Sequence, residues 1–343
     1  MGKVPPPALG HGNPEIALPM VEAHFDRGVF LPAQGIWLDS KKSKSLAFVS
    51  HAHSDHTARH DTTVATPATI DLMRLRMGPL KGTLIPLAFG EARDFGSFSI
   101  RLIPAGHVLG SAQCLIVSEA GTLLYTGDFK LRKGATSGAA EFCRARTLIM
   151  ETTFGLPKYV FPPDAEVIAA ILDFCRAALA ENEVPVLLAY SLGKAQEVLH
   201  ALTQAGIATM PHPSISRLLP AYERAGFLFP GLADWEPSAA SGHVVVCPPN
   251  ARGPLDVIPR MRTAVITGWA LDSSTVYRSQ CEAAFPLSDH AGYDDLLRHV
   301  ENVSPDRVLT LHGFAQEFAR DLRVRGIEAW ALTGPNQLDL PLF

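Results

Sequence analysis

Short apolar runs bounded by turn-forming residues dominate the first half of the chain. Leu46–Ser50, Phe98–Ile103 and Thr147–Met150 have the length and composition that predict strands. Gln113–Val117 and Gly121–Thr126 are separated by a short turn, which predicts a hairpin. Polar residues follow most of these runs directly, and a fold built on a sheet carries its site at such strand ends. We therefore expect the chemistry of the molecule just beyond these strands.

The middle of the chain alternates between helical and extended patterns. Asp164–Ala180 carries apolar residues at helical spacing, and a second helix is expected from Gly193 to Leu202. Pro185–Ala189, Val244–Cys247 and Ala264–Thr267 are apolar strands. Strands that alternate with helices predict a small parallel α/β unit.

The last part returns to loops that contain histidine, and then alternates again. Helices are expected at Tyr293–Val300 and Ala315–Arg325, and strands at Arg307–Leu311 and Glu328–Leu332. The simplest organisation is an α/β fold in which one αββα-type domain, residues 1–155 and 286–343, is interrupted by an inserted α/β domain, residues 156–285.

Composition narrows the class of protein. The 343 residues are 47% hydrophobic and 19% charged, so disorder is expected only in the Pro- and Gly-rich stretch Met1–Pro14. No apolar run reaches the roughly 18 residues of a membrane span, and no signal pattern opens the chain, which predicts a soluble cytoplasmic protein without membrane contact. Five scattered cysteines are expected to be small core residues.

The formal net charge of −4 argues mildly against a general affinity for nucleic-acid backbones. It does not exclude a protein that contacts phosphate through bound cations rather than through lysine and arginine.

A dense group of possible metal ligands follows the first apolar strand. His51, His53, Asp55 and His56 lie within six residues. Imidazole nitrogens and carboxylate oxygens are ligands that zinc prefers in proteins. In an extended turn His51 and His53 can hold one ion, while Asp55 and His56 can hold a second one nearby. The alternative is a solvated polar loop.

Three further candidates each follow an expected strand and lie next to a glycine. They are His107, Asp128 and His312. A lone histidine is more often a structural residue, but three such positions together favour a metal centre. Asp128 would be the bridging carboxylate, since one carboxylate can hold two ions about 3.5–4 Å apart.

These motifs resemble those of the metallo-β-lactamase superfamily. The resemblance gives Asp39 the role of steadying the ligand loop from outside the metal. Glu151 in Met-Glu-Thr-Thr-Phe-Gly, His290 in Ser-Asp-His-Ala-Gly and His312 in Leu-His-Gly are similar to the extra motifs of the β-CASP nuclease branch. Within that branch the chain most resembles the bacterial ligase-associated DNA exonucleases, through Thr153–Pro157, Ala189–Gln196 and Ser288–Ala291.

The resemblance implies a two-zinc nuclease, a DNA exonuclease of DNA repair that acts on single-stranded DNA. It also implies a DNA ligase or helicase as possible partners. Manganese or iron could replace zinc in such a His/Asp set. An RNA-processing ribonuclease of the β-CASP type is the main alternative. A small-molecule zinc hydrolase, such as a thioesterase or lactamase, and a non-catalytic scaffold are the others.

Two zinc ions would neutralise the phosphate and lower the pKa of a water towards about 7. Asp55 could be both ligand and proton acceptor for that water. By resemblance, His290 contacts the scissile phosphate as general acid, and Glu151 orients it. The alternatives are a structural histidine for His290 and an ordinary strand-end carboxylate for Glu151.

Several further basic and polar residues have two possible roles. Ser191, Gly193 and Lys194 lie where a strand turns into a helix, and they could hold a substrate phosphate or simply cap the helix. Lys130, Arg132 and Lys133 could line the groove, although a solvated surface run is the default. The remaining histidines are interpreted as surface or packing residues, and they include His24, His60, His200 and His299.

Overall fold

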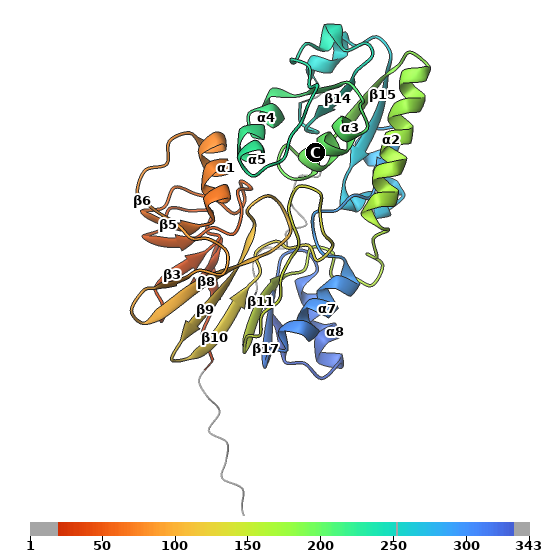
Figure 1. Ribbon diagram of the computed structural model, residues 1–343. Helices are drawn as coiled ribbons and strands as arrows, with labels where there is room; N and C mark the ends of the chain where they lie inside the picture. The colour runs from red at the N-terminus through yellow and green to blue at the C-terminus, as the bar shows by residue number, and fades with distance from the viewer. Residues whose placement is uncertain (1–19, 252, 333–343) are drawn as a thin grey trace, which may run out of the picture.

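The structure, a computed structural model, describes residues 20–251 and 253–332. The stretch Met1–Pro14, for which disorder is expected, lies outside these residues. Three sheets make up the described chain. Two of them form a body at the bottom of the view in Figure 1, and the third lies above them with its own helices. We call these parts the two-sheet body and the parallel-sheet unit.

The first sheet of the body has six strands in chain order. The first three pair antiparallel, and the following ones pair parallel. Helix α1 (Pro67–Met77) connects β5 to β6 and begins at a Thr66 cap whose hydroxyl accepts the Thr69 amide. The strands are β1 (His24–Phe25), β2 (Val29–Leu31), β3 (Ile36–Leu38), β4 (Leu46–Phe48), β5 (Thr62–Ala65) and β6 (Thr83–Pro86).

The second sheet has seven strands in the order β18-β17-β11-β10-β9-β8-β7. Its antiparallel half contains the expected hairpin, and β11 and β17 pair parallel beside it. The strands are β7 (Ala92–Asp94), β8 (Phe98–Pro104), β9 (Ala112–Ser118), β10 (Gly121–Tyr125), β11 (Thr147–Glu151), β17 (Arg307–Leu311) and β18 (Ala329–Ala331).

The two sheets of the body face each other over one apolar core. Buried Leu31, Phe48 and Val64 of the first sheet share it with Ile100 and Ile116 of the second. On the opposite side of the second sheet, a separate core packs it against α7 (Tyr293–Val303) and α8 (Ala315–Val324). Both helices are seen beside β17 in Figure 1.

The parallel-sheet unit is a five-stranded sheet in the order β13-β14-β12-β15-β16, and its neighbouring strands all pair parallel. Buried strands such as Val244–Cys247 are apolar along their whole length, as expected for a sheet covered on both faces. Its elements are β12 (Val184–Leu188), β13 (Thr209–Pro211), β14 (Val244–Cys247), β15 (Met261–Ile266), β16 (Ala283–Phe285), α2 (Asp164–Ala180), α3 (Lys194–Gln204), α4 (Pro213–Ser216), α5 (Leu219–Arg224), α6 (Ser274–Ser279), and the short 3-10 helices η1 (Pro237–Ala239), η2 (Gly253–Val257) and η3 (Gly268–Leu271).

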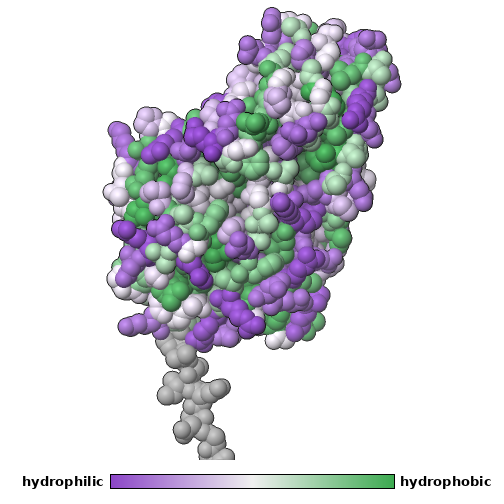
Figure 2. All heavy atoms as spheres, in the orientation of Figure 1, coloured by the Kyte–Doolittle hydropathy of each residue, from purple (hydrophilic) through white to green (hydrophobic). Residues whose placement is uncertain are grey.

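The sequence therefore predicted a mixed α/β protein correctly, together with the parallel strands of its middle part. Helix α1 was not predicted. Among the described residues, no helix has both the length and the apolar character needed to cross a bilayer. On the face drawn in Figure 2, hydrophilic residues are spread widely with smaller apolar patches between them, as on a water-facing surface.

Candidate metal centre

Strand ends of both sheets of the body meet at one place and bring the candidate ligands with them. The loop after β4 carries His51, His53, Asp55 and His56. His107, Asp128 and His312 follow β8, β10 and β17. His312 and Gly313 have positive φ angles of 59° and 52°, so the chain turns sharply where the imidazole leaves the strand.

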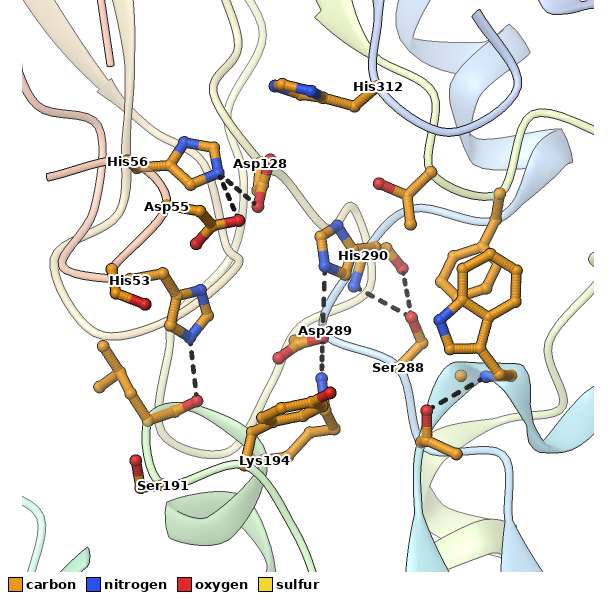
Figure 3. A pocket seen from close by; sticks show the side chains of 18 of the residues that line it. His53, Asp55, His56, Asp128, Ser191, Lys194, Ser288, Asp289, His290 and His312 are labelled. Atoms are coloured by element: carbon orange, nitrogen blue, oxygen red, sulfur yellow. Dashed lines mark hydrogen bonds and ion pairs between the residues drawn. The ribbon is translucent and has the colours of Figure 1, made fainter. Parts of the chain in front are cut away.

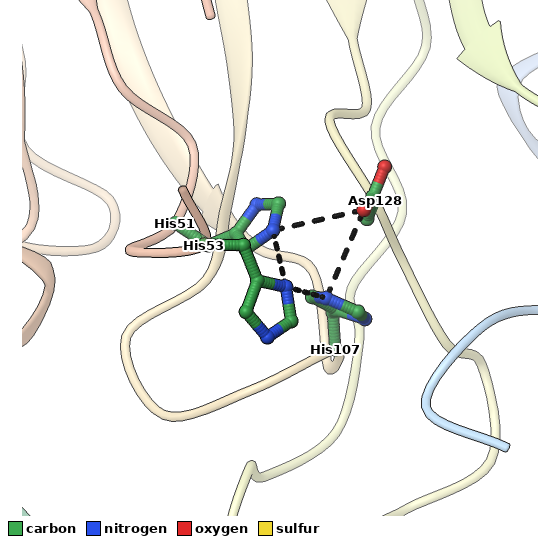
Figure 4. Close-up of side chains that lie close together, drawn as sticks. All are labelled: His51, His53, His107 and Asp128. Carbon is green, nitrogen blue, oxygen red and sulfur yellow. Dashed lines mark hydrogen bonds and ion pairs between the residues drawn. The ribbon is translucent and has the colours of Figure 1, made fainter. Parts of the chain in front are cut away.

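Four of these side chains converge on one point, drawn in Figure 4. The Nδ1 atom of His53 lies 2.9 Å from Nε2 of His51 and 3.1 Å from Nε2 of His107. The Oδ2 atom of Asp128 lies 3.6 Å and 3.8 Å from the same two Nε2 atoms. Ligands about 2.0–2.1 Å from a tetrahedral zinc ion are roughly 3.3–3.4 Å apart, so these separations have the size of a metal site.

The outer nitrogens of the three rings fix their tautomers. Nε2 of His53 lies 3.1 Å from the Leu192 carbonyl, and Nδ1 of His107 lies 2.7 Å from the Asp289 carbonyl. A carbonyl only accepts, so both outer nitrogens must carry the proton. Nδ1 of His51 lies 2.9 Å from Oγ of Ser50, whose own proton goes to Asp39. His51 must therefore donate as well.

Three nitrogen lone pairs consequently point at one another without a proton between them. Burial lowers the pKa of His51 and His53, and lowers that of His107 to about 3, so the rings are held neutral. Buried lone pairs at 2.9–3.1 Å repel unless a cation lies between them. Metal-binding histidines have this arrangement, with the outer N–H given to a carbonyl or hydroxyl. The residues present thus fit a divalent metal ion.

A second, looser group surrounds the same Asp128 oxygen. Nε2 of His56 lies 3.3 Å from Oδ2 of Asp128 and 3.7 Å from Oδ2 of Asp55. The His312 ring is more distant, with its centroid 5.9 Å from that of His56. Burial would lower the pKa of His56, but Asp128, Asp55 and Asp39 raise it well above its usual value. This part of the site attracts positive charge, and Oδ2 of Asp128 faces both groups.

Asp39 fixes the ligand loop from behind. Its Oδ1 accepts the Ser50 amide at 2.7 Å, and its Oδ2 accepts Nδ1 of His56 and the Tyr125 hydroxyl, both at 2.9 Å. Asp39 itself has a φ of 50°, so the backbone bends at this point. The carboxylate therefore orients the His56 ring so that its Nε2 faces Asp128.

Next to the metal group, His290 and Glu151 form a hydrogen-bonded pair. Nδ1 of His290 lies 2.8 Å from Oε1 of Glu151, which also accepts the Phe129 amide at 3.0 Å. Burial opposes protonation of His290, but Glu151, Asp128 and Asp289 outweigh it and raise its pKa to about 9. The His290 ring lies 4.7 Å, centroid to centroid, from that of His107.

A cavity of about 380 Å³ lies over these side chains, between the two-sheet body and the parallel-sheet unit. Figure 3 shows His290 and Asp128 on one side of it, and Ser191 and Lys194 on another. Residues of both parts line it: His53, Ser54, Asp55, His56, Arg76, Asp128, Thr153, Phe154, Tyr190, Ser191, Leu192, Lys194, Thr267, Gly268, Trp269, Ser288, Asp289, His290 and His312.

The Ser191–Lys194 turn has much of its hydrogen bonding already satisfied. The Gly193 amide donates to Oε1 of Gln196 at 2.8 Å, and Nε2 of Gln196 donates to the Ser191 carbonyl at 2.9 Å. Lys194 is buried and paired with the Asp289 carboxylate, whose pKa it lowers against the effect of burial. This arrangement caps α3, while the Ser191 and Lys194 side chains still line the cavity.

The basic run after Asp128 has a third role that the sequence did not suggest. Lys130 is buried and its Nζ lies 2.5 Å from Asp164 at the start of α2, while Arg132 lies 2.7 Å from the same carboxylate. Neither residue lines the cavity; Lys130 is buried, Arg132 is half-buried and Lys133 is exposed. Of the other histidines, His24 is exposed, His60 and His299 are buried, and His200 packs near Phe227 and Phe229.

Three contributors to the site were missed. Asp289 and Leu192 act through backbone carbonyls, which no residue type reveals. Arg76 extends from α1 into the cavity and donates to the Ala52 carbonyl beside the ligand loop. An arginine on a helix carries no signal of this kind, whereas Asp289 directly precedes His290 and could have been suspected.

These features define a class: a mixed α/β protein with a buried His/Asp centre, suited to divalent metal, at the joined ends of two sheets. Similar proteins carry names consistent with that class. The chain is 50% identical over 323 residues to a "Probable DNA ligase" of Opitutus terrae, covering 93% of this chain and 32% of that protein. It is 26% identical to "RNase aCSPSF2" of Saccharolobus solfataricus, over 60% of this chain and 49% of that one. It is 30% identical to "5' exonuclease Apollo" of Rattus norvegicus, over 49% and 34%.

The chain thus spans about a third to a half of the length of these relatives. A crystal structure of a protein of unknown function from Enterococcus faecalis shares the fold, with a TM-score of 0.57 and 13% identity over 79% of this chain and 76% of that one. No protein-family model matches. The chain belongs to the β-CASP branch of the metallo-β-lactamase superfamily.

Proposed function

We propose that this protein is a two-zinc phosphodiesterase that hydrolyses nucleic acid, and that its substrate is DNA cleaved from an end. The observation that carries the proposal is the convergence of His51, His53 and His107 lone pairs beside the shared Oδ2 of Asp128. In the proposal these four residues hold one ion, and Asp55, His56, Asp128 and His312 hold the other.

When bound, the two cations would neutralise phosphate charge and lower the pKa of a water to about 7. Asp55 is the residue proposed to accept the proton of that water. Its side chain lines the cavity, and His56 and His53 lower its pKa although burial opposes them. A carboxylate that is ionised and still open to the cavity suits this role.

His290 is the proposed general acid for the leaving oxygen. Its Nδ1 is held by Glu151, which leaves Nε2, 3.7 Å from Oδ1 of Asp289, to carry the transferable proton at the cavity wall. Glu151 is itself fixed by the Phe129 amide and by the Thr153 amide and hydroxyl. It therefore acts by orienting His290 and keeping it charged.

The names of the relatives bear on the substrate. One is a probable DNA ligase and another a 5' exonuclease, which favour DNA and a role beside a ligase in repair. Another is named an RNase, so RNA is the second candidate. Ser191 and Lys194 are proposed to contact the substrate from the parallel-sheet unit.

The domain arrangement forms part of this proposal. We propose that residues 156–285, which contain the parallel-sheet unit, are inserted into an αββα domain formed by residues 1–155 and 286–343. Two observations support this arrangement. Apolar cores lie on both faces of the seven-stranded sheet, and the five-stranded parallel sheet is separate from it. The insertion supplies the second wall of the cavity.

The test uses the full chain and end-labelled DNA and RNA oligonucleotides of the same sequence. We expect zinc or manganese to support release of nucleotides from single-stranded DNA, and a chelator to abolish it. Elemental analysis should find two zinc ions per chain. Absence of nucleotide release from either polymer would refute the proposal, and turnover of a thioester or β-lactam by the same preparation would identify a small-molecule hydrolase instead.

A further inference from the structure

Two aromatic side chains at one edge of the parallel-sheet unit face the candidate centre. Tyr190 follows β12 and Trp269 follows β15, and these strands pair side by side in parallel. In an open parallel sheet, ligands bind beyond the carboxyl ends of the strands. Both residues line the main cavity, and both also line a smaller pocket of about 30 Å³ next to it.

Buried rings hold Trp269 in place from behind. Its ring centroid lies 4.7 Å from that of Phe154 and 5.6 Å from that of Tyr159. Phe154 is buried, and its centroid is 6.1 Å from that of His290. Trp269 itself remains half-buried at the wall of the cavity. An indole that is held rigidly and stays partly exposed beside His290 offers a preorganised contact surface.

Gly268 allows this close approach. A Cβ atom at this position would lie 2.5 Å from Cζ of Phe154 and 3.1 Å from Oγ of Ser288. Ser288 in turn accepts the His290 amide at 3.0 Å. The segment that carries Trp269 can therefore pack directly on the His290 loop only because residue 268 has no side chain.

Tyr190 forms the other aromatic wall and is more open, with 46% of its surface exposed. The Lys194 ammonium, which is paired with Asp289, lies 5.6 Å from its ring centroid and fixes the position of the ring at that side of the cavity. The two rings are thus aromatic surfaces a short distance from the residues that would act on a phosphate.

We propose that Trp269 and Tyr190 form a subsite for an unpaired nucleobase of the substrate, with the base stacked on Trp269. This inference rests on the proposed function. Stacking on an aromatic side chain accepts every base, because each base has a π-face. In a duplex those faces are covered by neighbouring bases, so the subsite selects single-stranded nucleic acid or a frayed end.

The experiment removes one nucleobase from the DNA and, in a separate variant, the indole ring from the protein. A fluorescein-labelled single-stranded DNA is prepared intact and with one abasic residue at successive positions from the end. Affinity is measured by anisotropy with zinc-loaded protein, and KM and kcat by nucleotide release. In the wild type, one abasic position should weaken binding about 5- to 150-fold, the range for one stacked base.

Trp269→Ala should weaken binding of intact DNA to the same extent and show no further loss at that abasic position. Trp269→Phe should restore most of the affinity. Tyr277→Ala is the matched control, since Tyr277 is a ring of the same unit that is 87% exposed and lies outside the cavity lining. It should behave as wild type. Zinc content and the melting temperature show whether Trp269→Ala is still folded.

The outcomes separate the two proposals. Equal loss on base removal in wild type and Trp269→Ala, or no loss in either, would overturn the base subsite while leaving cleavage in place. Base-dependent binding without any nucleotide release would keep the subsite and overturn the proposed nuclease.

Discussion

At the scale of single residues, the candidate centre depends on where protons sit. Each metal-facing imidazole gives its outer N–H to an acceptor: Ser50, the Leu192 carbonyl or the Asp289 carbonyl. The His-rich loop was visible in the sequence because its ligands are close in the chain. The acceptors were not, because two are backbone atoms and the third is a serine.

Replacing Ser50 by alanine tests this proton arrangement. The change leaves Nδ1 of His51 without its acceptor and removes one contact of Asp39. Loss of such an outer partner typically lowers metal affinity about 10- to 100-fold. We expect this loss in a zinc competition titration with a chromophoric chelator. Ser40→Ala is the control, since Ser40 is equally buried but bonds the Lys42 carbonyl, and an equal loss there would contradict the argument.

Replacing His290 by alanine tests the proposed division between metal holding and proton transfer. His290 bonds Glu151, and one of its ring nitrogens lies within 4.8 Å of a carboxylate oxygen of Asp128. The nitrogens that approach one another within 3.1 Å belong to His51, His53 and His107. We expect two zinc ions to remain and kcat to fall about 10²- to 10⁴-fold, the usual contribution of a general acid. Metal content and kcat are measured on one preparation. Loss of zinc in this variant would show that His290 is a ligand.

At the scale of elements, regular periodicity decided what could be predicted. The periodic apolar face of Asp164–Ala180 predicted α2 at the bounds that the structure shows. Helix α1 was missed because its apolar and charged residues do not separate onto opposite faces, although Thr66 and Pro67 are a normal helix start. Only Pro67 and Arg74 of this helix are fully exposed, so too few positions face solvent to impose a polar stripe.

Helix α7 carries a buried histidine that should make stability depend on pH. His299 lies 4.5 Å from the Phe129 ring, and burial lowers its pKa from 6.5 to about 3. Its neutral form favours the fold, so the free energy of unfolding should fall as pH drops below 6.5 towards 3.

The His299→Leu variant should lose this contribution. Between pH 6 and 4 the wild type should lose up to about 1.4 kcal/mol more per pH unit than the variant, since one proton is involved. Urea unfolding at several pH values measures both slopes, and the other titrating groups cancel in the difference. Parallel curves would mean that His299 is already charged in the folded protein.

At the scale of the whole molecule, two kinds of ion pair connect the two-sheet body to the parallel-sheet unit. Arg224 and Asp71 form a pair at 3.1 Å in which both side chains are exposed or partly exposed. Lys130 and Arg132 meet Asp164 in a pair where the Lys130 side chain is only 3% exposed. Because it is buried, the Asp164 pair should affect the free energy of unfolding more than the exposed pair when one partner is removed.

Asp164→Asn should destabilise the protein by roughly 3 kcal/mol, because it leaves a buried lysine without its partner. Arg224→Ala should cost about 1 kcal/mol or less, as is usual for exposed pairs. Denaturant unfolding of both variants at the same salt concentration gives the comparison. Similar losses in the two variants would contradict the assignment of the buried pair as the stronger connection.

The packing of the whole molecule also decides how much of the site could be predicted from the sequence. The ligands and His290 lie in short motifs, so their types and neighbours identify them. Trp269, Tyr190 and Arg76 come to the cavity only through the packing of the parallel-sheet unit and α1 onto the body. No spacing along the chain encodes that arrangement, so the walls of the cavity had to be seen in three dimensions.

The Leu192 carbonyl that orients His53 belongs to the parallel-sheet unit, although His53 belongs to the body. Ion binding and the packing of the parallel-sheet unit on the body are therefore linked, and each must favour the other. Stripping the protein with a chelator should accelerate hydrogen exchange at the amides that begin α3, and zinc should reverse it. Identical exchange in both states would mean that the contact between the two parts does not respond to the ion.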